Sequence, residues 1–464
     1  MTGAPFEIAG PTSPFAVNLD QRYLLLPEFT LESGECLTNA PIAFQTWGKL
    51  NAEGTNAVLV CHAISGNALA TVWWDSLVGP GRVIDTNKFF VVCCNALGSP
   101  YGSASPVTRR GGEDVRNGHW QEASFVRESE KQTEISWWGS EFPQTTLRDD
   151  VQYVTRSHSA HKHVLDYLGI QQLVLVIGGS MGGMLSLEWP MCYPVRNPRT
   201  KDALPEAKEG EQKFVRAVAL MASPARHSAW AIAWSEIQRK SITSDGLYKD
   251  GNYLLSESPS DGLSAARMCA LITYRFPTSL ERRFRRLRGK QNMKKPAAPP
   301  VPPSRSVAEN VNASPTKIAQ IREPQDREMF AVQSYLHHNG KKFVDRFDPN
   351  CYIHLTHKLD AHDAARERHG WASNIGAADS DEALSRVLRH LGTSPVGCEM
   401  IIFSITSDLL YPPHDQRFIH ESVPGSQLAL VTSSEGHDAF LLEFTQIERN
   451  MRAFVQKLCP DAKL

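Results

Sequence analysis

Short apolar runs that end in loops rich in glycine, serine or asparagine recur along the chain. Runs of this length without alternation are typical of strands that are buried on both faces of a parallel sheet. They lie at residues 57–61, 89–94, 174–177, 214–221, 399–405 and 428–431. Before them, residues 24–48 alternate between apolar and polar on either side of Ser33-Gly34-Glu35. That pattern predicts an antiparallel hairpin.

Helical periodicity fills the spaces between these runs. We expect one helix from an N-cap at Thr146 to a stop at Gly169. A second helix follows the run at 174–177, and Pro190 and Pro194 are expected to end it early. Residues 223–288 are helical, and no clear strand interrupts until after residue 398. The pattern predicts an α/β core of residues 1–222 and 398–464, with a helical lid, 223–397, inserted into it.

Three polar segments lack any core pattern. Residues 107–140 are expected to form a surface insertion, and residues 196–213 a loop. The stretch near 290–326 is rich in proline and polar residues, which predicts a disordered segment within the lid. Before it lies a basic helix end, for which a solvated face is favoured over a phosphate contact: Arg282, Arg283, Arg285, Arg286 and Arg288.

Charge and cysteine usage narrow the class of protein. The 464 residues are 41% hydrophobic and carry 49 Lys and Arg against 50 Asp and Glu, so no overall charge draws the chain to nucleic acid or an anionic membrane. The apolar runs are too short to span a membrane, and the first residues do not resemble a leader peptide. Nine scattered cysteines without a C-x-x-C pair indicate reduced thiols and a cytoplasmic location. No spacing of residues suggests a metal site.

The candidate chemistry begins at Ser180, in the stretch Gly178-Gly179-Ser180-Met181-Gly182. An apolar run precedes this G-x-S-x-G motif and a helical pattern follows it, which is the context of a nucleophile elbow. A plain glycine-rich turn with an incidental serine is the alternative. The flanking strand and helix favour the nucleophile.

A serine nucleophile needs a base, an acid that orients the base, and donors for an oxyanion. Asp408 and His437 each follow a late buried run, in the chain order that this type of site requires. Histidines that precede Ser180 fit less well, and His62 is expected to shape its own loop. The oxyanion donors are predicted to be the backbone N–H groups of Met181 and Ile64.

Several blocks of sequence along the chain are distinctive when taken together. They include Cys61-His62-Ala63, Trp73-Trp74, Leu97-Gly98-Ser99-Pro100-Tyr101-Gly102, Arg148-Asp149-Asp150, Gly178-Gly179-Ser180-Met181-Gly182-Gly183-Met184, Ala225-Arg226-His227-Ser228-Ala229-Trp230 and Ala265-Ala266-Arg267-Met268. In these blocks the chain resembles one family, the fungal homoserine O-acetyltransferases. The resemblance runs from residue 29 to residue 443. It implies an α/β-hydrolase fold and an acyltransferase.

The resemblance also implies a reaction. Ser180 would take the acetyl group of acetyl-CoA, and the hydroxyl of L-homoserine would then remove it, giving O-acetyl-L-homoserine for methionine biosynthesis. Arg267 would bind the carboxylate of homoserine with support from Tyr274, and Asp438 would meet its ammonium group. Arg267 and Tyr274 are seven residues apart, so one helix can present both to one cleft. The resemblance further implies a homodimer through lid helices and no bound cofactor.

Some positions depart from that family. The stretch Ala63-Ile64-Ser65-Gly66 stands where the family has Ala-Leu-Thr-Gly, Pro190 stands where an alanine is usual, and the segments 107–140 and 196–213 are enlarged. The acceptor therefore stays open between L-homoserine, L-serine and a secondary metabolite such as deacetylcephalosporin C. Succinyl-CoA is the alternative donor. A serine esterase, with water as acceptor, is the alternative activity.

Overall fold

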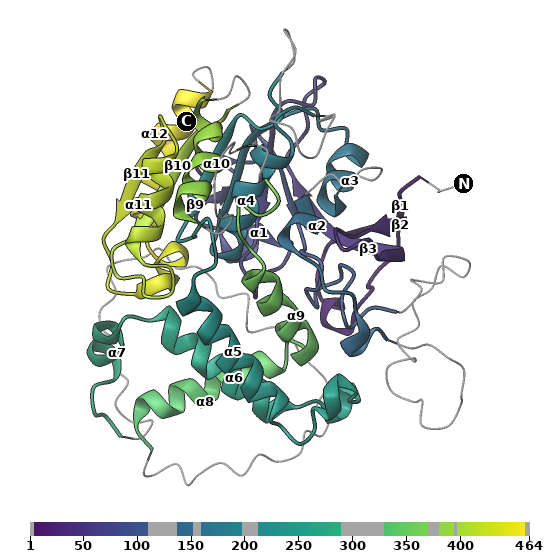
Figure 1. The fold of residues 1–464 in the computed structure, drawn as a ribbon, viewed down its shortest axis with the longest axis vertical. Helices are drawn as coiled ribbons and strands as arrows, with labels where there is room; N and C mark the ends of the chain where they lie inside the picture. The colour runs from purple at the N-terminus through teal and green to yellow at the C-terminus, as the bar shows by residue number, and fades with distance from the viewer. Residues whose placement is uncertain are drawn as a thin grey trace.

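A nine-stranded sheet forms the centre of the molecule, and helices lie on both of its faces (Figure 1). The structure is a computed structural model that describes residues 4–109, 137–151, 159–196, 212–288, 329–368, 371, 380–393 and 397–459. The strand order is β1-β2-β3-β7-β4-β8-β9-β10-β11. From β7 to β11 every pair of neighbours is parallel, whereas β1, β2 and β3 pair antiparallel at one edge. The predicted α/β class is confirmed.

Strands form at each of the six predicted apolar runs and in the predicted hairpin, whereas the strands at residues 6–8, 78–79 and 84–85 were not predicted. Their bounds are β1 (Phe6–Ile8), β2 (Arg22–Thr30), β3 (Cys36–Trp47), β4 (Ala57–Cys61), β7 (Phe90–Cys94), β8 (Leu173–Gly179), β9 (Ala217–Met221), β10 (Glu399–Ile405) and β11 (Gln427–Val431), with a separate short pair β5 (Val78–Gly79) and β6 (Ile84–Asp85). The predicted hairpin is β2–β3, whose register closes at Thr30 opposite Cys36.

Successive residues of the buried strands face opposite sides of the sheet. In β4, Leu59 joins one apolar cluster, and Val58 and Val60 join the other. Helices on one side of the sheet, and helices of the lid, add side chains to the first cluster. Helices on the other side, at residues 70–73 and 444–458, add side chains to the second. The uninterrupted apolar runs are explained by this burial on both faces.

The helices around the sheet are α1 (Ala70–Trp73), α2 (Leu147–Val151), α3 (Ala160–Tyr167), α4 (Met181–Cys192), α10 (Asp381–Thr393), α11 (Pro413–Ser422) and α12 (Phe444–Leu458). The single helix expected from Thr146 to Gly169 is wrong, because α3 has its own N-cap. Ser159 adopts an extended backbone there, and its side chain accepts a hydrogen bond from the backbone N–H of Lys162. Thr146 does cap α2: its backbone N–H donates to Asp149, whose own N–H points back to the threonine hydroxyl.

Pro190 does not end α4, so that part of the prediction is wrong, although the helix does stop before Pro194. The helix continues through Pro190 to Cys192 and is buried along its whole length. A proline in the last turn costs one hydrogen bond to the preceding turn. Burial against α2, β8 and β9 outweighs that loss.

A group of helices lies together at one end of the molecule, below the sheet as drawn in Figure 1. These are α5 (Ala229–Thr243), α6 (Ser260–Tyr274), α7 (Pro277–Phe284), α8 (Ala331–Val344) and α9 (Pro349–Asp360). The expected lid reached residue 397 and so included α10, but α10 packs against α11 beside the sheet. The helices at this end of the molecule are therefore α5 to α9.

The expectations for residues 110–136, 197–211 and 290–326 lie outside the described residues. The two described ends of the expected insertion at 107–140 meet in an antiparallel bridge between Arg109 and Trp137. Val107 is buried in the core, so the insertion begins after it. None of the helices in the described ranges combines the length and apolar character of a membrane span.

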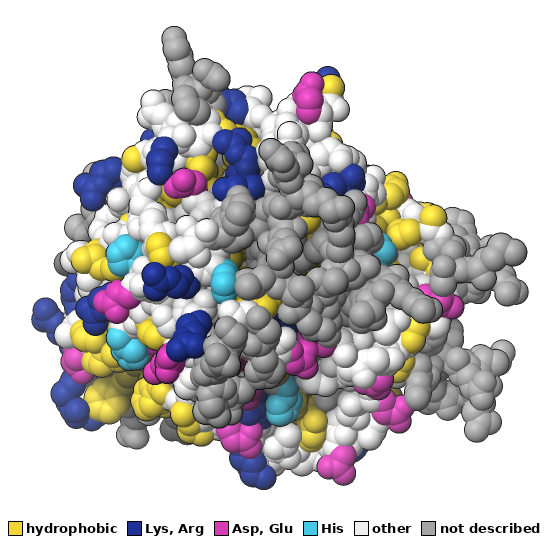
Figure 2. All heavy atoms as spheres, turned by 45° about the horizontal axis from the view of Figure 1, so that its top comes forward, with side chains coloured by type: hydrophobic (Ala, Val, Ile, Leu, Met, Phe, Trp, Pro, Cys, Tyr) yellow, Lys and Arg dark blue, Asp and Glu magenta, His cyan; other side chains and the backbone are white. Residues whose placement is uncertain are grey.

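Acidic and basic side chains are mixed over the face of the molecule in Figure 2. This agrees with a formal net charge of −1.

Candidate active site

The backbone at Ser180 is strained in the way a nucleophile elbow requires. Ser180 lies between β8 and α4 with φ 57° and ψ −127°, a conformation that L-residues rarely adopt. Neighbouring elements hold it there. Its N–H donates to the carbonyl of Met221, and its carbonyl accepts from the Ser223 hydroxyl at 2.7 Å.

Four glycines around Ser180 are required by close packing. A Cβ at Gly182 would overlap the carbonyl oxygen of Cys61, and one at Gly178 would overlap the carbonyl of Gly182. The other two glycines, Gly179 and Gly183, also have no free space beside them. The ring of Phe440 fills the space beside Gly179, and the hydroxyl of Ser223 fills the space beside Gly183.

Asp408 and His437 form a buried pair at the ends of β10 and β11. His437 Nδ1 lies 2.7 Å from Asp408 Oδ2. The other carboxylate oxygen of Asp408 accepts the backbone N–H groups of Leu410 and Tyr411. Burial alone would lower the pKa of His437, but the charge of Asp408 and this hydrogen bond together raise it above the ordinary histidine value. The pair can therefore stabilise a transient imidazolium.

The turn that carries His437 packs against the elbow. Phe440 contacts Gly179, directly before Ser180, and its ring centre is 5.4 Å from that of His437. His437 Nε2 is buried and has no hydrogen-bond partner among the described residues. The rings of Tyr274 and Tyr411 lie on other sides of the imidazole, at 5.7 and 5.3 Å between centres. The structure thus brings the predicted serine, histidine and aspartate to one place.

One predicted oxyanion donor belongs to the elbow, and the other lies in a loop whose start contacts it. Met181 is the first residue of α4, so its N–H has no acceptor within the helix. Ile64 lies in the loop after β4, and the same loop contacts Gly182 through the carbonyls of Cys61 and His62.

The structural role expected for His62 is supported. Its Nε2 accepts the backbone N–H of Ala96 at 3.0 Å, and its Nδ1 lies 2.8 Å from the Ala63 carbonyl. Burial lowers the pKa of His62 to about 4, so the ring is neutral and joins the loops that follow β4 and β7.

Two of the three predicted substrate-binding residues, Arg267 and Tyr274, lie on the lid helix α6, and the ring of Tyr274 packs beside His437. The Arg267 guanidinium lies 5.6 Å from the ring centre of Tyr274 and 4.8 Å from that of Phe343. Its Nη1 is buried and has no hydrogen-bond partner among the described residues. The third, Asp438, lies beside His437 but is already paired, since Arg275 Nη2 is 3.2 Å from its Oδ2.

Two arginines that contact these loops were missed from the sequence. Arg275 joins Glu435 and Asp438, on either side of His437. Arg346 donates to the Ser65 carbonyl, in the oxyanion loop, at 3.2 Å and to the Tyr101 hydroxyl at 3.0 Å. The position of Arg275 directly after Tyr274 was the only available signal. Arg346 had none, because its partners are more than 240 residues away in the chain.

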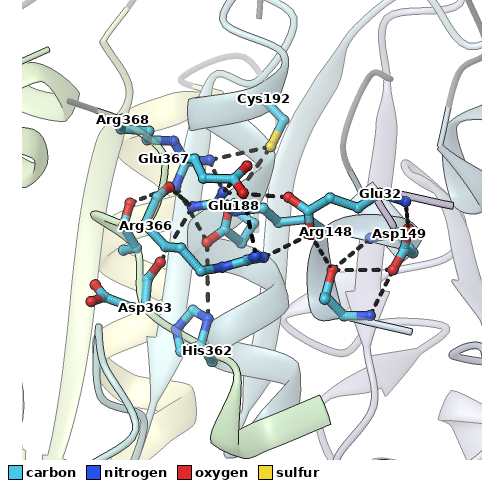
Figure 3. Close-up of polar contacts among 12 residues, drawn as sticks. Glu32, Arg148, Asp149, Glu188, Cys192, His362, Asp363, Arg366, Glu367 and Arg368 are labelled. Carbon is cyan, nitrogen blue, oxygen red and sulfur yellow. Dashed lines mark hydrogen bonds and ion pairs between the residues drawn. The ribbon is translucent and has the colours of Figure 1, made fainter. Parts of the chain in front are cut away.

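A buried ionic cluster anchors the chain after α9 to the helix that begins at the elbow (Figure 3). Glu188, on α4, pairs with Arg368 at 2.7 Å and with Arg148, on α2, at 3.6 Å. Arg148 also donates to the carbonyls of Asp363 and Arg366. Burial opposes ionisation of Glu188, but the two arginines lower its pKa to about 2. The cluster therefore ties residues 363–368 to α2 and α4.

The described residues contain no group of three or more His, Cys, Asp or Glu side chains placed to hold a metal ion.

Residues 56–444 match the family described as the alpha/beta hydrolase fold.

Relatives of known name match nearly the whole chain. A homoserine O-acetyltransferase of Gibberella fujikuroi is 40% identical, covering 99% of this chain and 94% of the relative. Homoserine O-acetyltransferases of Emericella nidulans and Saccharomyces cerevisiae are 38% and 37% identical. They cover 97% and 95% of this chain, and 90% and 87% of the relatives.

Solved structures agree with the fold. A homoserine O-acetyltransferase from Bacillus anthracis has a TM-score of 0.65 at 20% identity, covering 94% of this chain and 97% of that one. Esterase E22 has the same TM-score and identity, covering 94% and 99%. At this identity the likeness shows a common fold.

Proposed function

The chain belongs to the homoserine O-acetyltransferase family of the α/β-hydrolase fold, and from this we propose that it moves an acetyl group from acetyl-CoA to the hydroxyl of L-homoserine. The product is O-acetyl-L-homoserine, an intermediate of methionine biosynthesis. The observation that supports an amino acid as the acceptor is the environment of Arg267. Its Nη1 is buried and has no hydrogen-bond partner within the described part of the chain, and a guanidinium suits the carboxylate of an amino acid.

The first half-reaction acetylates Ser180. His437 takes the hydroxyl proton while the serine oxygen attacks the thioester carbonyl, and Asp408 stabilises the imidazolium. The N–H groups of Met181 and Ile64 hold the oxyanion. When the carbon–sulfur bond breaks, His437 returns the proton to the sulfur, so CoA leaves as a thiol and acetyl-serine remains.

The second half-reaction transfers the acetyl group. Arg267, with Tyr274 beside it, binds the carboxylate of homoserine, and Asp438 meets its ammonium group. His437 removes the proton of the homoserine hydroxyl, whose oxygen attacks the acetyl-serine. The ester forms on homoserine, and His437 returns the proton to Ser180.

Acetyl-CoA is a co-substrate in this scheme, and no bound cofactor or metal takes part.

We also propose a cytoplasmic location and a homodimer through the lid helices. Exposed apolar side chains on α5 and α6, such as Trp230, Ile237 and Ile272, support a second copy of the chain there. Sedimentation of the purified protein would give a monomer mass if the dimer is wrong.

Release of CoA from acetyl-CoA, with and without an acceptor, tests the function. We expect homoserine to accelerate release strongly, and equal rates would favour an esterase. A parallel panel with L-serine and hydroxylated metabolites such as deacetylcephalosporin C decides between acceptors, and succinyl-CoA tests the donor.

The S180A variant tests the nucleophile. It should form no acetyl-enzyme by mass spectrometry, and an acetyl adduct on another residue would contradict the assignment.

A further inference from the structure

Arg275 connects the end of a lid helix to both sides of the turn that carries His437. It directly follows Tyr274, the last residue of α6. Its Nη1 lies 2.8 Å from Glu435 Oε2, and its Nη2 lies 3.2 Å from Asp438 Oδ2. One planar guanidinium therefore bridges the residues that bracket Gly436 and His437. Arginine suits this role because its donors have a fixed fork geometry.

The backbone of this turn fits closely against the end of α6. Gly436 has φ +72°, and a Cβ there would lie 2.7 Å from both the Tyr274 carbonyl oxygen and the Phe276 nitrogen. Glu435 is held further by the Ser279 hydroxyl at 2.9 Å and by Arg282 at 2.6 Å. The position of the turn is thus set by contacts with the lid as well as by β11.

The environment of Asp438 makes its charge depend on Arg275. The two side chains are 21% and 14% exposed, so water screens the pair only in part. Burial raises the pKa of Asp438, and the Arg275, His437 and Arg267 cations oppose that rise. Tyr274, on α6, and Asp408, after β10, are the other titratable groups that face it. The contact of Arg275 with Asp438 is to Oδ2, at 3.2 Å. We infer that a carboxylate held on this side can also meet the ammonium group of the acceptor.

We propose that Arg275 is a positioning residue for the second half-reaction. It keeps Asp438 ionised and oriented to receive the ammonium group of the acceptor, whereas the turn that presents His437 is also held by the packing of Gly436 against the end of α6. This inference rests on the proposed transfer to an amino acid. It adds that a lid residue controls the acceptor step more than the acetyl-CoA step.

The R275Q variant tests this, because glutamine keeps hydrogen-bonding groups but removes the charge. We expect kcat/KM for homoserine to fall about 30-fold or more, mainly through KM, as is usual when one partner of a buried charge pair is removed. Formation of the acetyl-enzyme should slow less than about threefold. His437 and Asp438 both titrate on the acid limb of kcat/KM for homoserine. That limb should move to higher pH in R275Q, because loss of the cation raises the pKa of Asp438.

Two further variants serve as controls for R275Q. R282Q removes a second cation from Glu435 without touching Asp438, and it should leave both half-reactions close to wild type. R275K restores the charge without the fork and should recover part of the homoserine KM, which also covers the case in which R275Q folds poorly. Equal losses in both half-reactions with an unmoved acid limb, or no loss at all, would overturn the proposal. An inactive wild type in the same assay would count instead against the proposed function.

Discussion

Ser180 and His437 work only because their surroundings hold each in a state that it would not adopt alone. Ser180 keeps a strained backbone because Met221 and Ser223 bond both of its peptide groups. His437 is buried and would resist protonation, yet Asp408 makes protonation accessible. Both effects come from a few named neighbours, so single substitutions can test them.

The D408N variant should change the pH dependence as well as the rate. His437 must be neutral to accept a proton, so activity falls as the pH drops through its raised pKa. Removing the Asp408 charge lowers that pKa and moves the acid limb to lower pH, while kcat falls by about 10⁴. A pH profile of kcat/KM measures both. An acid limb that stays in place would contradict the role of Asp408.

The G182A variant should lose stability and activity, because the new Cβ would overlap the Cys61 carbonyl beside the oxyanion loop. Overpacking of this kind costs about 1–3 kcal/mol, and the overlapped atom here is backbone. G246A is the matched control, since a Cβ there meets nothing within 4 Å. Chemical denaturation of the two variants checks the contrast, and equal stabilities would refute the packing argument.

At the scale of elements, α4 performs two tasks. Its first turn holds the elbow, and Glu188 on the same helix anchors residues 363–368 through Arg368 and Arg148. Such a cluster contributes little net stability over an apolar core, but losing one partner leaves charges buried without compensation.

The E188Q variant should therefore destabilise the fold by about 3–5 kcal/mol, because Arg368 and Arg148 lose their shared carboxylate. The depressed pKa of Glu188 means that its contribution is present above the ordinary carboxylate pKa and is lost as the pH falls towards about 2. Urea unfolding at neutral pH measures the difference. E382Q, in an exposed pair with Arg386, is the control and should behave as wild type.

At the scale of the whole molecule, the lid and the sheet share one apolar core. The cluster that contains Leu59 and Val176 continues into the lid through Tyr352, Leu355 and Leu359. Lys358, on α9, also forms a buried ion pair with Asp150, on α2. The lid is therefore bound to the core by apolar and ionic contacts together.

We predict that α9 and β8 unfold in one transition, because the apolar cluster has no break between them. Native-state hydrogen exchange should give the amides of both elements similar opening free energies. A lid that opens well below the core, with α9 exchanging first, would show that the contacts at residues 352–359 are weak.

The sequence alone determined the features whose signals are local. Apolar runs and one alternating segment placed every strand of the main sheet except β1, and the motif around Ser180 with the later Asp408 and His437 gave the candidate triad. Where local signals competed with packing, the predictions failed. Pro190 did not end α4, and Ser159 begins a separate helix within the single one expected from Thr146 to Gly169.

Only the tertiary structure decided which charges meet. Arg275 and Asp438 are 163 residues apart, and Arg346 lies 281 residues from the Ser65 carbonyl that it holds. Nothing in the spacing of a sequence encodes such pairs, because they depend on how the lid returns to the sheet. Burial then sets the strength of these ion pairs. A charge that is removed from water loses its hydration, so its stability depends on the oppositely charged partner that the fold places beside it.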